Sequence, residues 1–220
     1  MLRSRLLAAT PHAFSGRADG DMRREVRGPS EAVVAALGGR GPLVTATQVH
    51  GRAVVFAEQV GSDPVEADAL VCTTPGTVIA VRVADCVPVL LAAPGGVAAI
   101  HAGWRGTAAD VVREGLRALC EATGVAPSRV RAAVGPSIRG CCYAVGDEVI
   151  VGVEAVAPGR SWLRGQQVDL AIANAEILAA AGVEVEVVGG CTRCGEGWYS
   201  HRASDAERQV GAIGLLGAPA

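Results

Sequence analysis

The sequence predicts a mixed α/β (α+β) fold in which strands form the centre and helices cover them. Two observations predict it. Short apolar runs rich in β-branched residues are concentrated between positions 43 and 100, separated by Gly- and Pro-containing turns. After position 107, segments with apolar residues at helical spacing alternate with short strand-like runs. This order of strands, helix, strand, helices and strand is typical of α/β or α+β proteins rather than of helical bundles or β-sandwiches.

The N-terminal region carries weak structural signals. Residues 16–29 are polar and rich in Gly and Arg, which predicts a loop. Ser30 is a predicted N-cap for a short helix over residues 31–37 that Gly38 and Gly39 end. Six predicted strands follow, over residues 43–49, 53–57, 69–72, 78–83, 87–92 and 97–100. Several are apolar on both faces, which indicates strands buried between layers.

The clearest helix is predicted over residues 107–122. Ala109, Val112, Leu116 and Leu119 recur at helical spacing, and Gly124 closes the segment. The remaining elements are a strand over 130–134, helices over 146–157 and 168–181, and a strand over 183–188. No repeat or linker divides the chain, so we expect a single domain over residues 1–220.

Composition excludes several function classes. The chain has 220 residues and a net charge of −2, and all 20 basic residues are Arg. Without Lys there is no Schiff-base chemistry, no pyridoxal phosphate lysine and no Walker-type phosphate lysine. An aromatic content of 3 % and the lack of a basic excess argue against nucleic acid as a partner.

The sequence predicts a cytoplasmic protein without a membrane partner. The longest apolar region, residues 77–100, is interrupted by charged residues, Pro and Gly, so it cannot cross a bilayer as one helix. The apolar stretch near the N-terminus is too short for a signal peptide. Seven Cys residues are an odd number, which argues against a disulfide framework and points to ligands, nucleophiles or buried thiols.

Three residues suited to binding zinc stand at strand ends or breaks. His50 ends TATQVH, Cys86 lies in VADCVP between two strands, and His101 ends VAAIH. Three such ligands leave a fourth coordination position open, as in catalytic zinc sites. A zinc ion with one thiolate keeps a net charge of about +1, which can polarise a carbonyl or bind an anion. The alternative is that the histidines reach water and the cysteine is buried as a small apolar residue.

Asp85 is the carboxylate adjacent in sequence to one of these residues, Cys86. It is either a hydrogen-bond partner that orients a histidine ligand or only a turn residue.

Five segments resemble a known family in the same order: TQVHG, ADCVP, HAGWRG, GPSIRGCCYAVGDEV and CTRCGEGWYSHR. They are similar to the YfiH-type family, also called the multicopper polyphenol oxidase or laccase-domain family and the peptidoglycan editing factor family. The resemblance runs from about residue 43 to about residue 202. The opening PHAFSGR is similar too, but the stretch that follows it is shorter here than in the family.

The resemblance implies a four-layer α/β/β/α fold and a zinc site at His50, Cys86 and His101, with copper as the alternative metal. It also implies purine nucleoside and phosphate as small-molecule partners, and a monomer or homodimer. The implied reactions are phosphorolysis of adenosine, inosine and methylthioadenosine, and deamination of adenosine.

Several residues take catalytic or substrate-binding roles under this resemblance. Arg105 is a candidate phosphate clamp, because a guanidinium makes bidentate contacts, or else a surface residue in a Gly-rich turn. Asp85 is the candidate acid–base group for deamination. Gln48, in TQVHG, and Cys142 and Tyr143, in the Gly-bounded loop, are expected to contact substrate.

The C-terminal motif offers two further features. His201 and Arg202 match the family's SHR segment and are expected near the pocket. Cys191 and Cys194 form a CxxC pair that could be redox-active. The family pattern covers only Cys191 and Thr192, however, so we expect Cys194 to be incidental and no disulfide to form.

Three other functions compete with the nucleoside enzyme. The first is a hydrolase acting on an amide or a cell-wall peptide precursor, with Cys86 as nucleophile and His101 as base, which bound zinc would inhibit. The second is copper-dependent polyphenol oxidation, which needs more His than the four present. The third is a metal-stabilised interaction module without turnover, which an open three-ligand site disfavours.

Overall fold

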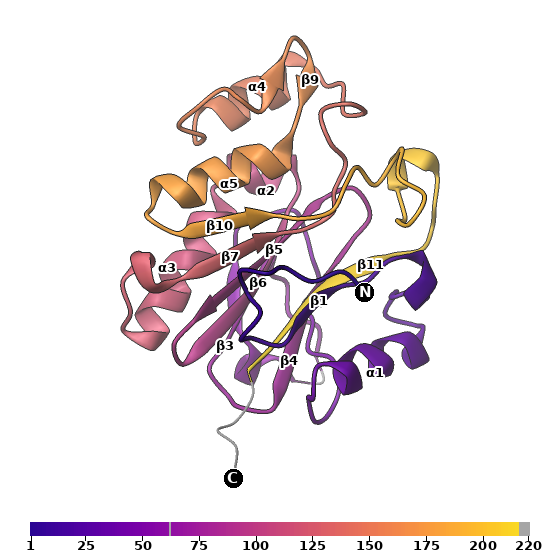
Figure 1. The fold of residues 1–220 in the computed structure, drawn as a ribbon, viewed down its shortest axis with the longest axis vertical. Helices are drawn as coiled ribbons and strands as arrows, with labels where there is room; N and C mark the ends of the chain where they lie inside the picture. The colour runs from indigo at the N-terminus through magenta and orange to yellow at the C-terminus, as the bar shows by residue number, and fades with distance from the viewer. Residues whose placement is uncertain (62, 216–220) are drawn as a thin grey trace.

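Two β-sheets pack face to face between helices in the computed structural model, which describes residues 1–61 and 63–215 (Figure 1). The larger sheet has six strands in the order β10-β7-β5-β6-β3-β2, and the smaller has the order β1-β11-β4. The strands of the larger sheet are β2 Val54–Phe56, β3 Ala69–Cys72, β5 Val87–Ala93, β6 Gly96–Ala102, β7 Arg131–Val134 and β10 Glu184–Val187. The smaller sheet contains β1 His12–Phe14, β4 Thr77–Val83 and β11 Gln209–Leu215, and β8 Leu163–Arg164 pairs with β9 Gln167–Val168.

Five α-helices cover the two outer faces of this sheet pair: α1 Arg27–Ala36, α2 Trp104–Ala108, α3 Val111–Thr123, α4 Asp147–Glu154 and α5 Leu170–Ala180. Short 3-10 turns lie at η1 Arg17–Asp19, η2 Ala57–Gln59, η3 Pro127–Arg129 and η4 His201–Ala203. The larger sheet is mixed: β5 and β6 form a central antiparallel hairpin, whereas β10 with β7 and β2 with β3 are parallel pairs.

Alternation along the strands separates three apolar cores. On β6, Ile100 faces α3 while Ala99 faces the smaller sheet. On β4, Ile79 faces the larger sheet while Val78 and Ala80 face α1. Successive strand residues point to opposite faces, so a strand apolar at every position must be covered on both sides. The four layers are therefore α2–α5, the six-stranded sheet, the three-stranded sheet and α1. The predicted mixed fold class and α/β/β/α layering are confirmed.

Two predicted elements differ in the structure. Residues 43–49 are not a strand: Val44 pairs with Val78 and Ala80, whereas Thr47 pairs with Val65 and Ala67. The segment makes one isolated bridge to β4 and one to the loop before β3 instead of lying along one strand. The predicted helix over 107–122 is two helices, α2 and α3, because Asp110 takes a left-handed conformation with φ 66° between them.

Other differences lie toward the chain ends. The first helix begins at Arg27 rather than after Ser30, so Pro29 stands in its first turn, where a missing N–H is tolerated. Strand β11 was not predicted, because Gly211 and Gly214 weaken the strand signal. Gly211 is required by packing: a Cβ there would lie 2.8 Å from Cβ of Pro88 on the facing sheet.

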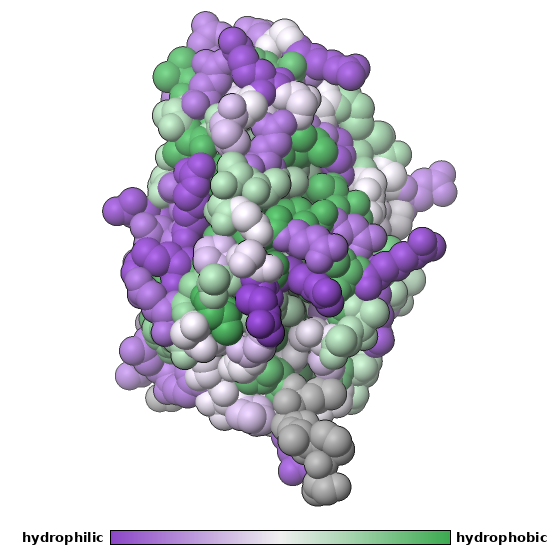
Figure 2. All heavy atoms as spheres, turned by 60° about the vertical axis from the view of Figure 1, so that its left-hand side comes forward, coloured by the Kyte–Doolittle hydropathy of each residue, from purple (hydrophilic) through white to green (hydrophobic). Residues whose placement is uncertain are grey.

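The surface is mixed in character. Figure 2 shows one face, where apolar and polar side chains interleave and hydrophilic residues project from both edges. Among the residues that the structure describes, no helix combines the length and apolar character needed to cross a membrane.

Close packing of α3 on β6 gives a test of the fold. A Cβ at Gly115 would lie 2.5 Å from Cδ1 of Ile100. Alanine gains about 1 kcal/mol in helix propensity over glycine, but overpacking costs about 1–3 kcal/mol. We expect Gly115→Ala to lower the free energy of unfolding by about 1 kcal/mol in urea titrations. In the control Gly28→Ala, in α1, the new Cβ meets nothing within 4 Å. A lowered stability in this control, or none in Gly115→Ala, would contradict this packing.

Candidate active site

A buried carboxylate, Asp68, organises one end of the larger sheet. Its side chain is 0 % exposed and lies just before β3. The backbone N–H groups of Val49, His50 and Gly51 donate to its two oxygens at 3.2, 3.0 and 2.7 Å. Nδ1 of His101, on β6, lies 2.8 Å from Oδ1. Asp68 therefore ties the loop that carries His50 to the strand that carries His101.

The structure brings His50, Cys86 and His101 together. One donor atom from each lies within 4.8 Å of the others. His101 is buried, Cys86 is half-buried and His50 is exposed, so the cluster opens on one side. The imidazole rings of His50 and His101 are 4.9 Å apart at their centroids and nearly perpendicular. The cluster lies where the chain passes from β4 in the smaller sheet to β5 in the larger one.

Hydrogen bonding fixes the orientation of His101. An ionised carboxylate only accepts, so Nδ1 of His101 must carry the proton that it donates to Asp68. In the neutral ring, Nε2 then has a free lone pair, as in the carboxylate–histidine arrangement of metal sites. His50 takes a left-handed backbone conformation with φ 60°, which the three N–H bonds to Asp68 hold in place.

The cluster favours a thiolate at Cys86. Burial alone would raise the pKa of this thiol, but the neighbouring imidazoles of His101 and His50 lower it to about 6. Burial alone would lower the pKa of His101, but Asp68 and Cys86 raise it to about 9. Two imidazole nitrogens and one sulfur are donors that zinc accepts, so the residues present fit that metal.

Gly103 allows the HAGWRG segment to pass close to these donors. A Cβ on Gly103 would lie 3.0 Å from Sγ of Cys86 and 3.1 Å from Cδ2 of His50. Any side chain at this position would press on two of the three donor residues. Close packing therefore requires glycine at position 103, the first glycine of HAGWRG.

Asp68, rather than Asp85, makes the carboxylate contact to His101. Asp85 instead accepts hydrogen bonds from Oγ1 of Thr192 at 2.6 Å and from the backbone N–H of Arg202 at 2.7 Å. Its carboxylate thus fixes the C-terminal motif beside the site. The backbone at Asp85 takes a left-handed conformation with φ 85°. A part for Asp85 in acid–base chemistry stays a prediction.

A cavity of about 490 Å³ adjoins the cluster. His50, Cys86, His101 and His201 line it, together with Gln48, Ala46, Thr47, Ala84 and three arginines, Arg24, Arg82 and Arg208. Among the described residues, the ion pairs that arginines form with carboxylates involve other arginines. Three arginines without a direct carboxylate partner among the described residues therefore line the cavity, although the charge of Glu25 acts on Arg82. The sequence analysis missed this feature.

Two of these arginines are anchored by neutral oxygens. Arg82 donates from Nε to the carbonyl of Met22 at 2.6 Å and from Nη1 to Oγ1 of Thr45 at 2.7 Å. Nη1 of Arg208 donates to the carbonyls of Ala206 and Glu207, both at 2.8 Å. These hydrogen bonds hold each guanidinium in place. They involve Nε or Nη1, and Nη2 takes part in none of them.

Two predicted substrate contacts sit differently from expectation. The amide of Gln48 exchanges hydrogen bonds of 2.7 and 2.8 Å with the backbone of Arg82, so its main contacts are structural, although it lines the cavity. Arg105 is exposed, with its guanidinium stacked 4.3 Å from the ring centroid of Trp104. It is not among the residues that line the cavity.

The two substrate contacts predicted in the loop before α4, Tyr143 and Cys142, lie in different surroundings. Tyr143 is half-buried, with the guanidinium of Arg202 5.3 Å from its ring centroid. Burial raises the pKa of Tyr143, and the charge of nearby Cys86 adds to this effect. Cys142 instead faces three other thiols, and His201 lines the cavity as expected. Contact of Tyr143 or Cys142 with substrate stays a prediction.

These features belong to one family of proteins. The model of the family described as multi-copper polyphenol oxidoreductase laccase matches residues 13–216, so the chain is a member of that family.

Relatives and solved structures agree with this assignment. A purine nucleoside phosphorylase of Deinococcus radiodurans is 37 % identical over 232 residues, covering 94 % of this chain and 90 % of the relative. Adenosine deaminase RL5 from an unknown prokaryotic organism is 38 % identical over 144 residues, covering 58 % and 53 %. The crystal structure of YlmD from Geobacillus stearothermophilus superposes with a TM-score of 0.77 at 30 % identity, covering 94 % and 90 %.

Removing the charge of Asp68 is expected to weaken metal binding. In Asp68→Asn the amide no longer stabilises the proton on Nδ1 of His101 and accepts fewer backbone N–H bonds. Loss of such a partner typically costs about 10–100-fold in metal affinity. Zinc titration against a competing chelator measures the change. The exposed Asp63→Asn is the control. Equal zinc affinity in Asp68→Asn and the wild type would contradict the orienting role.

Proposed function

We propose that this protein is a zinc-dependent enzyme that phosphorolyses purine nucleosides such as adenosine, inosine and methylthioadenosine. The observation that carries the proposal is one cavity lined both by three residues that could bind a metal ion and by three arginines that form no direct ion pair among the described residues. Phosphorolysis needs both a site for phosphate and a means of stabilising charge on the departing base. The relative from Deinococcus radiodurans, named a purine nucleoside phosphorylase, supports the same reaction.

In this reaction a phosphate oxygen bonds to the anomeric carbon of the ribose while the bond from that carbon to the purine nitrogen breaks. The base leaves with the electron pair of the broken bond and takes up a proton, giving free base and ribose 1-phosphate. Arg24, Arg82 and Arg208 would hold the phosphate, because guanidinium N–H groups make charge-assisted bonds to its oxygens. The two anchored guanidiniums need little reorganisation to bind it.

His50, Cys86 and His101 would hold the zinc ion, and Asp68 would orient two of these three. Bound there, zinc would supply Lewis-acid polarisation at the mouth of the cavity. The histidine inventory favours zinc over a multi-copper centre. Of the four His, His12 is buried away from the site, where its ring nitrogens meet the N–H of Ser4 and the carbonyl of Thr10.

Two other reactions can be argued from specific observations. Adenosine deamination is supported by the relative named adenosine deaminase RL5. A cysteine hydrolase is supported by the Asp68–His101–Cys86 arrangement, which has the members of a nucleophile, base and orienting-carboxylate triad. The hydrolase needs a free thiolate, so added zinc would inhibit a hydrolase. Added zinc would instead activate the nucleoside enzyme.

Product analysis tests the proposal directly. Zinc-loaded protein given adenosine is expected to release adenine and ribose 1-phosphate only when phosphate is present. Cys86→Ala removes a metal donor, and we expect adenine release to fall at least about 100-fold. Cys120→Ser, outside the cavity, is the matched thiol control. Chromatography of the products measures the outcome.

Each alternative gives its own result in that experiment. Inosine formed without phosphate would assign deamination to the site. Absence of both products from protein shown to contain zinc would overturn the nucleoside function. Turnover of amide substrates that appears only after chelation would then identify the hydrolase.

If the arginines that line the cavity bind phosphate, replacing one of them should weaken phosphate binding. Arg24 lines the cavity from the exposed loop before α1, so Arg24→Ala removes charge without emptying a core. Loss of one charge-assisted contact costs about 1.5–3 kcal/mol, so we expect KM for phosphate to rise about 10–100-fold. Zinc content should not change. The control is Arg40→Ala, an exposed arginine elsewhere. An unchanged KM for phosphate in Arg24→Ala would remove this residue from the phosphate site.

A further inference from the structure

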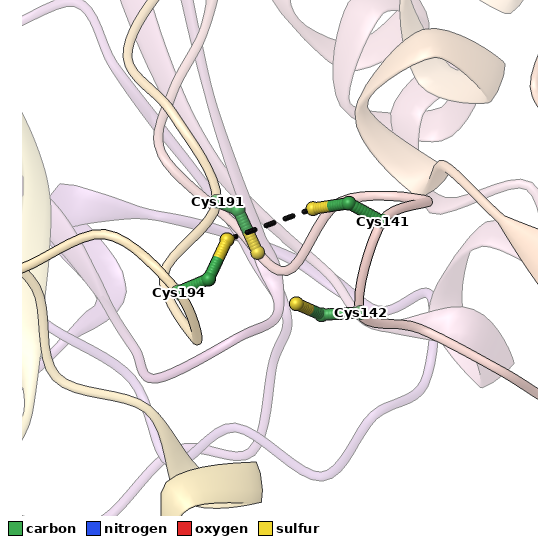
Figure 3. A group of neighbouring side chains, drawn as sticks. All are labelled: Cys141, Cys142, Cys191 and Cys194. Carbon is green, nitrogen blue, oxygen red and sulfur yellow. Dashed lines mark hydrogen bonds between the residues drawn. The ribbon is translucent and has the colours of Figure 1, made fainter.

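A second cluster of metal-binding side chains lies outside the cavity. The Sγ atoms of Cys141, Cys142, Cys191 and Cys194 all lie within 4.8 Å of one another. Figure 3 shows the four thiols converging from two loops. Sγ of Cys141 is 3.7 Å from Sγ of Cys194. Cys194, which the sequence analysis treated as incidental, is therefore a full member of this cluster.

Two loops far apart in the sequence supply these thiols. Cys141 and Cys142 lie in the loop between β7 and α4, and Cys191 and Cys194 lie in the turn that follows β10. A parallel bridge between Ser137 and Cys191 brings the loops together. The N–H of Gly195 donates to the carbonyl of Cys191 at 3.0 Å and closes the CxxC turn.

Backbone donors are directed at one of the sulfurs. The N–H of Arg139 donates to Sγ of Cys191 at 3.4 Å. The backbone N–H groups of Arg193 and Cys194 also face this sulfur. Such N–H groups stabilise a thiolate, which is the form of cysteine that binds metals.

The geometry is that of a metal site rather than of buried thiols or disulfides. Cys141 and Cys194 are exposed, so the group is not explained as small apolar core residues. A tetrahedral site with zinc–sulfur bonds of about 2.3 Å places its sulfurs about 3.8 Å apart. The distance of 3.7 Å between Cys141 and Cys194 fits that spacing and is far longer than a disulfide bond of about 2.05 Å.

We propose that Cys141, Cys142, Cys191 and Cys194 bind a zinc ion as a tetrathiolate site, separate from the site at His50, Cys86 and His101. Four protein ligands fill the tetrahedral coordination of zinc, so this second site is structural rather than catalytic. The thiols lose their protons when the metal binds. A neighbouring cavity of about 640 Å³, lined in part by Cys141 and Cys191, gives an ion access from solvent.

The bound ion would fasten one wall of the active site. One of the joined loops carries Tyr143 directly after Cys142. The other carries Thr192, whose hydroxyl is bonded to Asp85, and leads to His201 on the cavity wall. Zinc in the thiolate site would therefore hold Tyr143 and His201 in place without touching substrate.

Metal counting in the full chain tests this proposal. Protein is stripped of metal, reduced, and loaded with zinc, and bound ions per chain are measured by elemental analysis and native mass spectrometry. We expect two ions in the wild type. The double variant Cys141→Ser with Cys194→Ser, changed only at exposed positions, is expected to bind one. The double variant His50→Ala with Cys86→Ala is also expected to bind one, and Cys120→Ser is expected to bind two.

Spectroscopy identifies the remaining site. Cobalt loaded into the His50→Ala, Cys86→Ala protein is expected to show intense thiolate-to-metal charge transfer and a tetrahedral ligand field. An equal number of bound zinc ions in the reduced wild type and in the Cys141→Ser, Cys194→Ser protein would overturn the proposal. So would a reduced His50→Ala, Cys86→Ala protein that binds no zinc. Both comparisons count ions at the four cysteines, so they hold whether or not the site at His50, Cys86 and His101 binds zinc or supports the proposed reaction.

Discussion

The hydrogen bonds around the carboxylate of Asp68 are the constraint on which the site depends. Burying an ionised carboxylate costs several kcal/mol unless it is paired and hydrogen-bonded. Asp68 meets this requirement with three consecutive backbone N–H groups and one imidazole. The same bonds bend the chain at His50, set the protonated nitrogen of His101, and join these two residues, which lie 51 positions apart. The charge of Asp68 thus determines the position of His50 and the tautomer of His101.

The other residues of the site meet at the cavity because the chain passes between the two sheets beside it. Cys86 lies in the crossover from β4 to β5, and the loop before α1 brings Arg24 to the same edge. The cavity is lined by three arginines although the chain has no lysine, and two of them, Arg82 and Arg208, are held by carbonyl and hydroxyl oxygens. A guanidinium stays protonated even when burial lowers its pKa, as it does for Arg82.

The sequence pattern predicted the mixed fold class and most strands, because alternation is a local signal, and the strand ends singled out His50, Cys86 and His101 as candidate metal ligands. The four-layer arrangement came from the resemblance to the family. The pattern could not predict which side chains form hydrogen bonds with each other. Asp85 was considered because it adjoins Cys86 in sequence, whereas Asp68 reaches His101 through the pairing of β3 with β6. One signal for Asp68 was available, a lone acid opening the buried apolar strand Ala69–Cys72. The thiol cluster was missed because its two cysteine pairs are separated by about 50 residues. Strand β11 was missed because its glycines mask a strand whose packing requires them.

The positions of His50, Cys86 and His101 in the fold would also link metal binding at these residues to folding. The three donors come from segments that the paired strands β3, β5 and β6 and the hydrogen bonds of Asp68 bring together, so the unfolded chain offers no equivalent site. A ligand that binds only the folded state stabilises it in proportion to the logarithm of its concentration, by about 2.7 kcal/mol at a hundredfold excess over Kd. If zinc binds there as proposed, the melting temperature of this protein would rise with the concentration of free zinc.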